Sequence, residues 1–195
     1  MLQSGESKRP QDWSRDGRFI LYTSEDPKTG NDLWVLPVGP AGADRKPTPY
    51  LKTEFNESQA QFSPGPEGAP GGAPRWMAYV SNESGRTQVY VQPFPVSGGK
   101  FQISSEGGYQ PRWRRDGKEL FFIASDARLM SVEVKTAPKF EATVPKALSQ
   151  TRILAAAGQF AHHYDVTPDG RRFLINSQLQ ETASAPITLV MNWQR

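Results

Sequence analysis

Cysteine is absent from the 195 residues of the sequence, which excludes disulfides and thiolate metal sites. Histidine is almost as scarce, since His162 and His163 are the only two. Adjacent side chains on a strand point to opposite faces of a sheet, so this pair cannot easily hold one metal ion. A zinc site also requires three or four ligands. We therefore expect neither a metal nor another cofactor.

Long apolar segments are also missing. No run reaches the about 18 apolar residues that a transmembrane helix needs. The first eight residues contain no apolar core of a signal peptide. The chain as written is therefore expected in the cytoplasm. It would be extracytoplasmic as part of a membrane-anchored kinase.

The motifs of several enzyme classes are absent as well. The sequence has no glycine-rich kinase loop, no His-Arg-Asp, no Asp-Phe-Gly, no P-loop and no Gly-x-Ser-x-Gly. We therefore expect that the chain is not an enzyme. The net charge is only +3, and the densest basic group, residues 112–118, is interrupted by Asp116. Because phosphate binding needs a continuous positive surface, nucleic acid is not an expected partner.

An internal repeat is the main positive signal. Residues 13–24, 113–124 and 166–177 share one pattern: an apolar residue, Asp-Gly three residues later, a basic residue and an apolar run. The second copy starts at Phe62 and resumes at Arg75 after a Gly/Pro-rich insert. The four apolar anchors Trp13, Phe62, Trp113 and Val166 are 49, 51 and 53 residues apart. A period of this length is typical of stacked supersecondary units.

Each copy predicts a small antiparallel sheet. The anchor ends one strand, Asp-Gly is expected to form a tight hairpin with φ > 0 at both residues, and the apolar run is the second strand. A weaker fourth strand, such as 100–104, is expected in the first three copies. Third strands are expected over 32–37, 88–93, 129–134 and 187–193.

Four antiparallel strands per period define a propeller blade. We therefore predict an all-β fold, a β-propeller of about four blades with four strands each, as a small ring or a partial propeller. The blades are expected over residues 10–54, 55–105, 106–152 and 153–195, with residues 1–8 as a candidate to close the last blade. A β-sandwich with accidental similarity is the alternative.

The pattern from Trp13 to Arg18 resembles the TolB-type WD-like repeat. Segments 79–86, 89–95, 110–120 and 186–193 further resemble the C-terminal propeller region of acidobacterial-type serine/threonine protein kinases. This resemblance implies a non-catalytic binding, sensor or scaffold module, the C-terminal propeller of a receptor-type bacterial kinase. A TolB-like periplasmic envelope protein and the substrate-gating propeller of a serine peptidase are the alternatives.

Propellers commonly bind ligands at the mouth of the central channel, beside the innermost strands. The residues three positions before the last three anchors are Gln59, Gln110 and His163, and a ring would place them at equivalent positions. Tyr109 and Tyr164 could line the same face. We therefore predict these five residues as a ligand-binding site for a protein, a peptide or a cell-envelope fragment. Solvated loop residues without a ligand are the other interpretation.

Overall fold

The computed structural model describes residues 5–39, 45–65, 72–153 and 161–176. This part of the chain is all-β: it contains strands and turns and no helix. The predicted third strand at 187–193 and residues 1–4 of the candidate closing segment 1–8 lie outside the described residues. Of the described part of that segment, Lys8 belongs to β1 and pairs with Ser24 of blade 1. The strands are β1 (Lys8–Trp13), β2 (Phe19–Asp26), β3 (Gly30–Pro37), β4 (Thr48–Leu51), β5 (Glu57–Phe62), β6 (Trp76–Ser81), β7 (Gln88–Pro93), β8 (Phe101–Gln102), β9 (Gly108–Trp113), β10 (Glu119–Ala124), β11 (Arg128–Lys135), β12 (Glu141–Ala142), β13 (Lys146–Gln150), β14 (Tyr164–Val166) and β15 (Phe173–Ile175).

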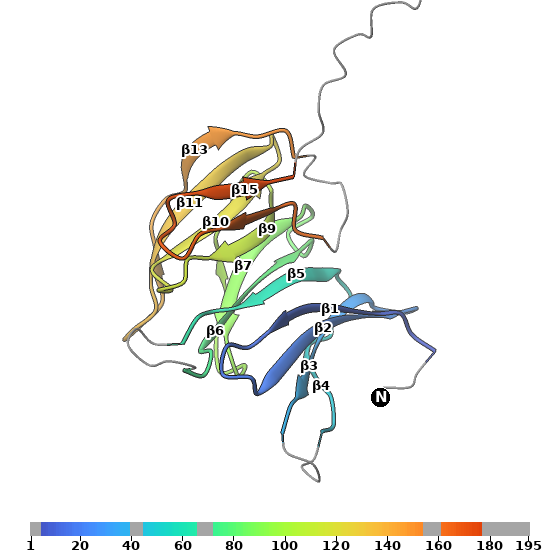
Figure 1. Cartoon of the computed structure of the whole chain (residues 1–195). Coiled ribbons are helices and arrows are strands. Elements are labelled where there is room, and N and C mark those ends of the chain that lie inside the picture. Colours follow the sequence, from blue (N-terminus) through green and yellow to red (C-terminus); the bar gives the residue numbers. More distant parts are fainter. Residues whose placement is uncertain (1–4, 40–44, 66–71, 154–160, 177–195) are drawn as a thin grey trace, which may run out of the picture.

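These strands form four antiparallel sheets, which we call blades 1 to 4. Blade 1 has the order β1-β2-β3-β4, and blade 2 has the order β5-β6-β7-β8. Blade 3 has the order β9-β10-β11, with β12 and β13 sharing the outer edge of β11. Blade 4 consists of β14 and β15 in the described residues. Figure 1 shows the sheets fanned side by side, with β1, β5 and β9 stacked in the middle. This arrangement is an arc of a β-propeller.

The Asp-Gly hairpins differ from the prediction in one respect. Only the glycines have positive φ, at 75° in Gly17, 72° in Gly117 and 74° in Gly170. The Gly17 N–H donates to the Ser14 carbonyl at 2.8 Å, so the turn is a four-residue loop rather than a two-residue one. The carboxylate of Asp16 accepts the N–H of Arg18 at 3.1 Å and the Ser14 hydroxyl at 2.6 Å. The aspartate therefore fixes the turn through its side chain.

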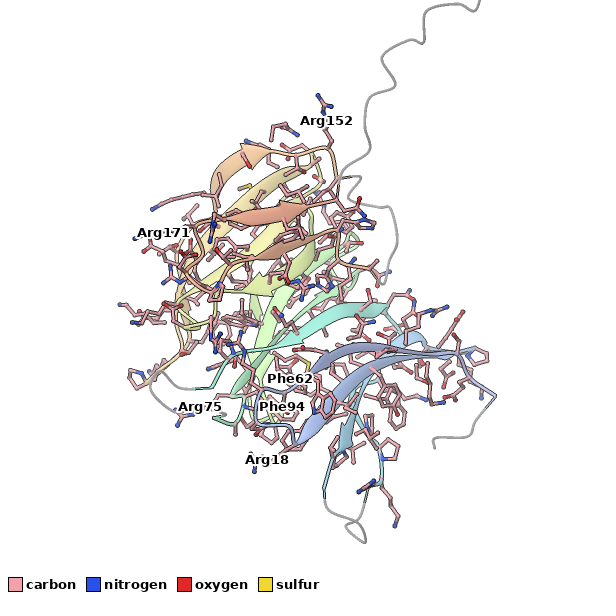
Figure 2. The ribbon with its side chains drawn as sticks, viewed as in Figure 1. Arg18, Phe62, Arg75, Phe94, Arg152 and Arg171 are labelled. Carbon is pink, nitrogen blue, oxygen red and sulfur yellow. The ribbon has the colours of Figure 1, made fainter. Side chains whose placement is uncertain are left out.

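Three apolar cores hold neighbouring blades together. The core between blades 1 and 2 includes Phe62 at the end of β5. Phe94, directly after β7, packs against this core, and the two ring centroids lie 4.9 Å apart (Figure 2). The core between blades 2 and 3 is built on Trp113 and Phe122. Between blades 3 and 4, the ring centroids of Phe121 and Phe173 are 5.0 Å apart, edge to face. Each internal blade therefore buries both of its faces, as stacked repeats require.

The first anchor behaves unlike the others. The sequence pattern predicts Trp13 as an inter-blade core residue together with Trp113, but 59% of Trp13 is exposed and only 3% of Trp113. Trp113 is covered by blade 2, whereas no described residue covers Trp13 to the same degree. The expectation for Trp13 is therefore wrong in this structure, because burial of an anchor depends on a preceding blade.

Candidate functional site

Two of the innermost strands carry the same β-bulge. In β5, residues 59 and 60 together oppose Tyr79, and in β9, residues 110 and 111 together oppose Phe122. The first residue of each bulge has positive φ, 49° in Gln59 and 57° in Gln110. A left-handed backbone costs a non-glycine residue about 1 kcal/mol. The bulge directs both glutamine side chains sideways, out of their own sheets.

These glutamines hydrogen-bond the backbone of the next blade. The Gln110 N–H donates to Oε1 of Gln59 at 2.8 Å, and the His163 N–H donates to Oε1 of Gln110 at 2.7 Å. Gln59 also donates from Nε2 to the Ala161 carbonyl at 3.4 Å. We call this row the glutamine seam. It satisfies backbone donors at the free edges of the innermost strands, which are otherwise exposed to wrong pairing.

The structure brings four of the five predicted site residues together. Gln59, Gln110 and His163 form the glutamine seam, and the Tyr164 hydroxyl donates to the Gln110 carbonyl at 2.9 Å. Gln59, Gln110 and Tyr164 are buried, whereas His163 and Tyr109 are half-buried. Ligand binding by these residues stays a prediction. His163 and Tyr109 keep the accessible surface that a ligand needs.

A second row of side chains lies one position before the anchors. The Phe62 N–H donates to Oδ2 of Asp12 at 2.8 Å, and the Trp113 N–H donates to Oε1 of Gln61 at 2.8 Å. The next member of the row is Arg112, whose side chain has no atom that can accept a hydrogen bond. The Val166 N–H donates instead to Oδ1 of its neighbour Asp165 at 2.9 Å. This row is absent from the sites predicted from the sequence. Its signal is the repeated polar residue directly before each anchor.

Burial perturbs the titration of the groups at this centre. It raises the pKa of Asp12 to about 6, against the opposing effects of the Phe62 N–H and Arg112. It lowers the pKa of His162 to about 3, and the positive charge of Arg112 acts in the same direction. His162 is therefore uncharged at neutral pH.

One further buried carboxyl lies at the junction of blades 1 and 2. Glu57 is 1% exposed and accepts the Thr53 hydroxyl at 2.6 Å, while Oε2 has no hydrogen-bond partner. Burial raises the pKa of Glu57 to about 7, and the negative charges of Asp32 and Glu83 contribute to this rise. Such a group affects stability near neutral pH.

A separate hollow of about 710 Å³ opens between blades 2 and 3, beside the β9–β10 hairpin. Its charged lining is balanced, and its ion pair between Arg114 and Glu119 measures 2.6 Å. It offers an irregular polar surface and no dominant charge. Its basic and acidic residues are Arg75, Arg114, Lys118, Lys135, Asp116, Glu119, Glu133 and Glu141.

Within the ranges that the structure describes, no three His, Cys, Asp or Glu residues are grouped in a way that could hold a metal ion. The same ranges contain no helix of the length and apolar character needed to cross a bilayer.

Two solved structures are similar to this chain in fold. A TolB candidate from Agrobacterium tumefaciens has a TM-score of 0.55 and 17% identity, over 84% of this chain and 56% of that one. A 6-phosphogluconolactonase candidate from Bacteroides uniformis has a TM-score of 0.53 and 14% identity, over 88% of this chain and 48% of that one. No family model matches the chain. No curated protein matches it either.

The four antiparallel sheets and these likenesses define the class as a β-propeller. The predicted fold class is thus confirmed, in its partial form. Within that class the chain has a TolB-like fold, as the repeat pattern indicated. It spans about half the length of the two solved structures.

Proposed function

We propose that this chain is a non-catalytic binding module whose ligand contacts the centre of the arc beside the glutamine seam. The observation that supports this is the inter-blade hydrogen bonding of Gln59 and Gln110, at 2.8 and 2.7 Å. It holds the half-buried side chains of Tyr109, in β9, and His163, directly before β14, beside the hydrogen-bonded inner strands. Binding residues supported in this way lose little conformational entropy when a ligand arrives.

The expected ligand is a protein segment, a peptide or a cell-envelope fragment. Tyr109 supplies an amphipathic ring, and Arg112, 23% exposed at its side chain, lies 3.9 Å from Asp165 at the neighbouring blade. An aromatic ring and a paired charge on the same inner strand suit a partner that has both apolar and polar groups. This composition favours peptide-like ligands over nucleic acid or a lipid surface.

We further propose the C-terminal propeller of a receptor-type bacterial serine/threonine kinase as the biological setting. The support is the resemblance of segments 79–86, 89–95, 110–120 and 186–193 to such proteins. A TolB-like envelope role is the second candidate, favoured by the likeness to the A. tumefaciens structure.

The binding site can be tested by NMR. The ¹⁵N-labelled chain is titrated with a synthetic muramyl peptide and, separately, with a random peptide pool. We expect shift changes centred on Tyr109, His163 and Arg112, and about tenfold weaker binding in Tyr109→Ala. As a matched control, Tyr90→Phe alters a tyrosine in the blade 1–blade 2 core and should bind normally. Shift changes confined to the hollow between blades 2 and 3 would contradict the proposed site.

The setting is tested separately by probing fractionated source cells with an antibody against the chain. A large membrane-associated band that autophosphorylates would support the kinase setting. A periplasmic band would support the TolB-like alternative.

A further inference from the structure

Blade 1 exposes a face that the internal blades bury. The register makes this face comparable with that of blade 3: Ile20 pairs with Trp13 and Leu36, as Leu120 pairs with Trp113 and Val132. Trp113, Leu120 and Val132 are buried against blade 2. In blade 1, Trp13 is 59% exposed, and Ile20 and Leu36 are half-buried. The face therefore has the composition and register of a blade-to-blade contact.

Blade 4 exposes the face that an internal blade turns toward the following blade, whereas blade 1 exposes the face that is turned toward the preceding blade. Phe173 and Ile175 pack toward blade 3, so the alternation of β15 places Leu174 on the other side. Leu174 pairs with Asp165 as Phe121 pairs with Arg112. Phe121 is buried under the following blade, whereas Leu174 is 78% exposed. The two ends of the arc are thus the two halves of one repeating contact.

The polar groups at the two ends are compatible with a contact between blade 4 of one chain and blade 1 of another. The glutamine seam joins a glutamine to a backbone N–H of the next blade. In a contact between blade 4 and a following blade 1, Pro10 would take the place of the residue whose N–H donates to the seam, opposite His163. Proline has no backbone N–H, so no acceptor is needed there. Trp13 already has its N–H bonded to the carboxylate of its neighbour Asp12. Such a contact therefore leaves no backbone donor of these two rows unsatisfied.

We infer that two copies of this chain join head to tail, blade 4 of each copy packing on blade 1 of the other. One chain carries both halves of the contact, so a two-fold arrangement would cover both ends of both arcs at once. The chain spans 56% and 48% of the solved propeller-like chains, so two copies supply about one full ring. The ring surrounds the central site with inner strands on all sides. This inference does not depend on the proposed ligand.

Light scattering coupled to size exclusion tests the assembly. The wild-type chain is expected at twice its 21.7 kDa. Trp13→Asp and Leu174→Asp are each expected as monomers. Mixed together, they should form a dimer again, because the mixture keeps one intact contact, Trp13 of one variant against Leu174 of the other. Val144→Asp is the matched control: it charges an apolar residue that is 82% exposed between β12 and β13, and it should stay dimeric.

Three results would overturn the inference. A monomeric wild-type chain would mean that further blades of a longer polypeptide cover the ends. A dimer that persists in Leu174→Asp would mean that two Trp13 faces meet each other. Failure of the mixture to recover a dimer, with circular dichroism showing both variants folded, would exclude head-to-tail contact. The milder Trp13→Gln, expected to weaken the dimer about tenfold, replaces Trp13→Asp if that variant unfolds.

Discussion

At the scale of single residues, Glu57 makes the stability of the arc depend on pH. Its pKa is about 7 in the folded chain and near the ordinary 4.5 when unfolded, because burial disfavours the charged carboxylate. Between these two values the folded chain binds the extra proton. Unfolding free energy should therefore fall as pH rises from about 4.5 to about 7, and level off above.

Glu57→Gln should remove the part of this dependence that Glu57 contributes, whereas the raised pKa of Asp12 acts below pH 6 in both proteins. The variant is expected to match the wild type at pH 5 and to exceed it by about 1–3 kcal/mol at pH 8, since an amide of the same shape carries no charge. Urea unfolding at both pH values measures the difference. Glu133→Gln, on an exposed carboxyl of β11, is the control and should leave the pH profile unchanged. Parallel profiles for the wild type and Glu57→Gln would contradict the assignment.

At the scale of strands and turns, the glutamine seam is the feature on which blade contacts depend. Gln110→Ala removes the acceptor of the His163 N–H and leaves a void at a side chain with 0% exposure. We expect a loss of about 2–3 kcal/mol of unfolding free energy, from the unpaired donor and the cavity together. Chemical denaturation measures it.

The matched control for this seam is Gln150→Ala. The Gln150 amide donates to the Asp126 carbonyl at 2.9 Å within one blade and in an exposed position. Its loss should cost less than about 0.5 kcal/mol. Equal costs for Gln110→Ala and Gln150→Ala would show that the seam adds nothing beyond an ordinary surface hydrogen bond.

The strands were predictable because their signals are local. The expected strand at 88–93 coincides with β7, and that at 32–37 lies within β3, since alternation and turn residues act over a few positions. The glutamine seam could not be foreseen in this way. The sequence predicts Gln59 and Gln110 as ligand-binding residues, because no periodicity reveals a left-handed bulge that turns a side chain into the next blade. The structure places the two glutamines at matching bulges of β5 and β9, and ligand binding by them stays a prediction.

At the scale of the whole molecule, the blades form a linear stack in which stability depends on neighbours. Blades 2 and 3 bury both faces, in the three cores that contain Phe62, Trp113 and Phe121. Blade 1 buries one face and exposes Trp13 on the other, and blade 4 exposes Leu174. In a stack with nearest-neighbour coupling, end units open first, since they have half the contacts to lose.

Hydrogen exchange should resolve this gradient along the chain. In Trp13→Asp the outer faces of the arc stay uncovered. In this variant we expect the amides of β6, β7 and β10 to exchange slowest, and those of β2, β3 and β15 to exchange about tenfold or more faster. In the wild-type chain at high concentration, β2 and β15 should gain protection together, because one head-to-tail contact covers both. Dilution provides the control, since it should remove that gain from both strands in parallel. Protection that rises in β2 while β15 stays unchanged would mean that the two ends are covered by different partners.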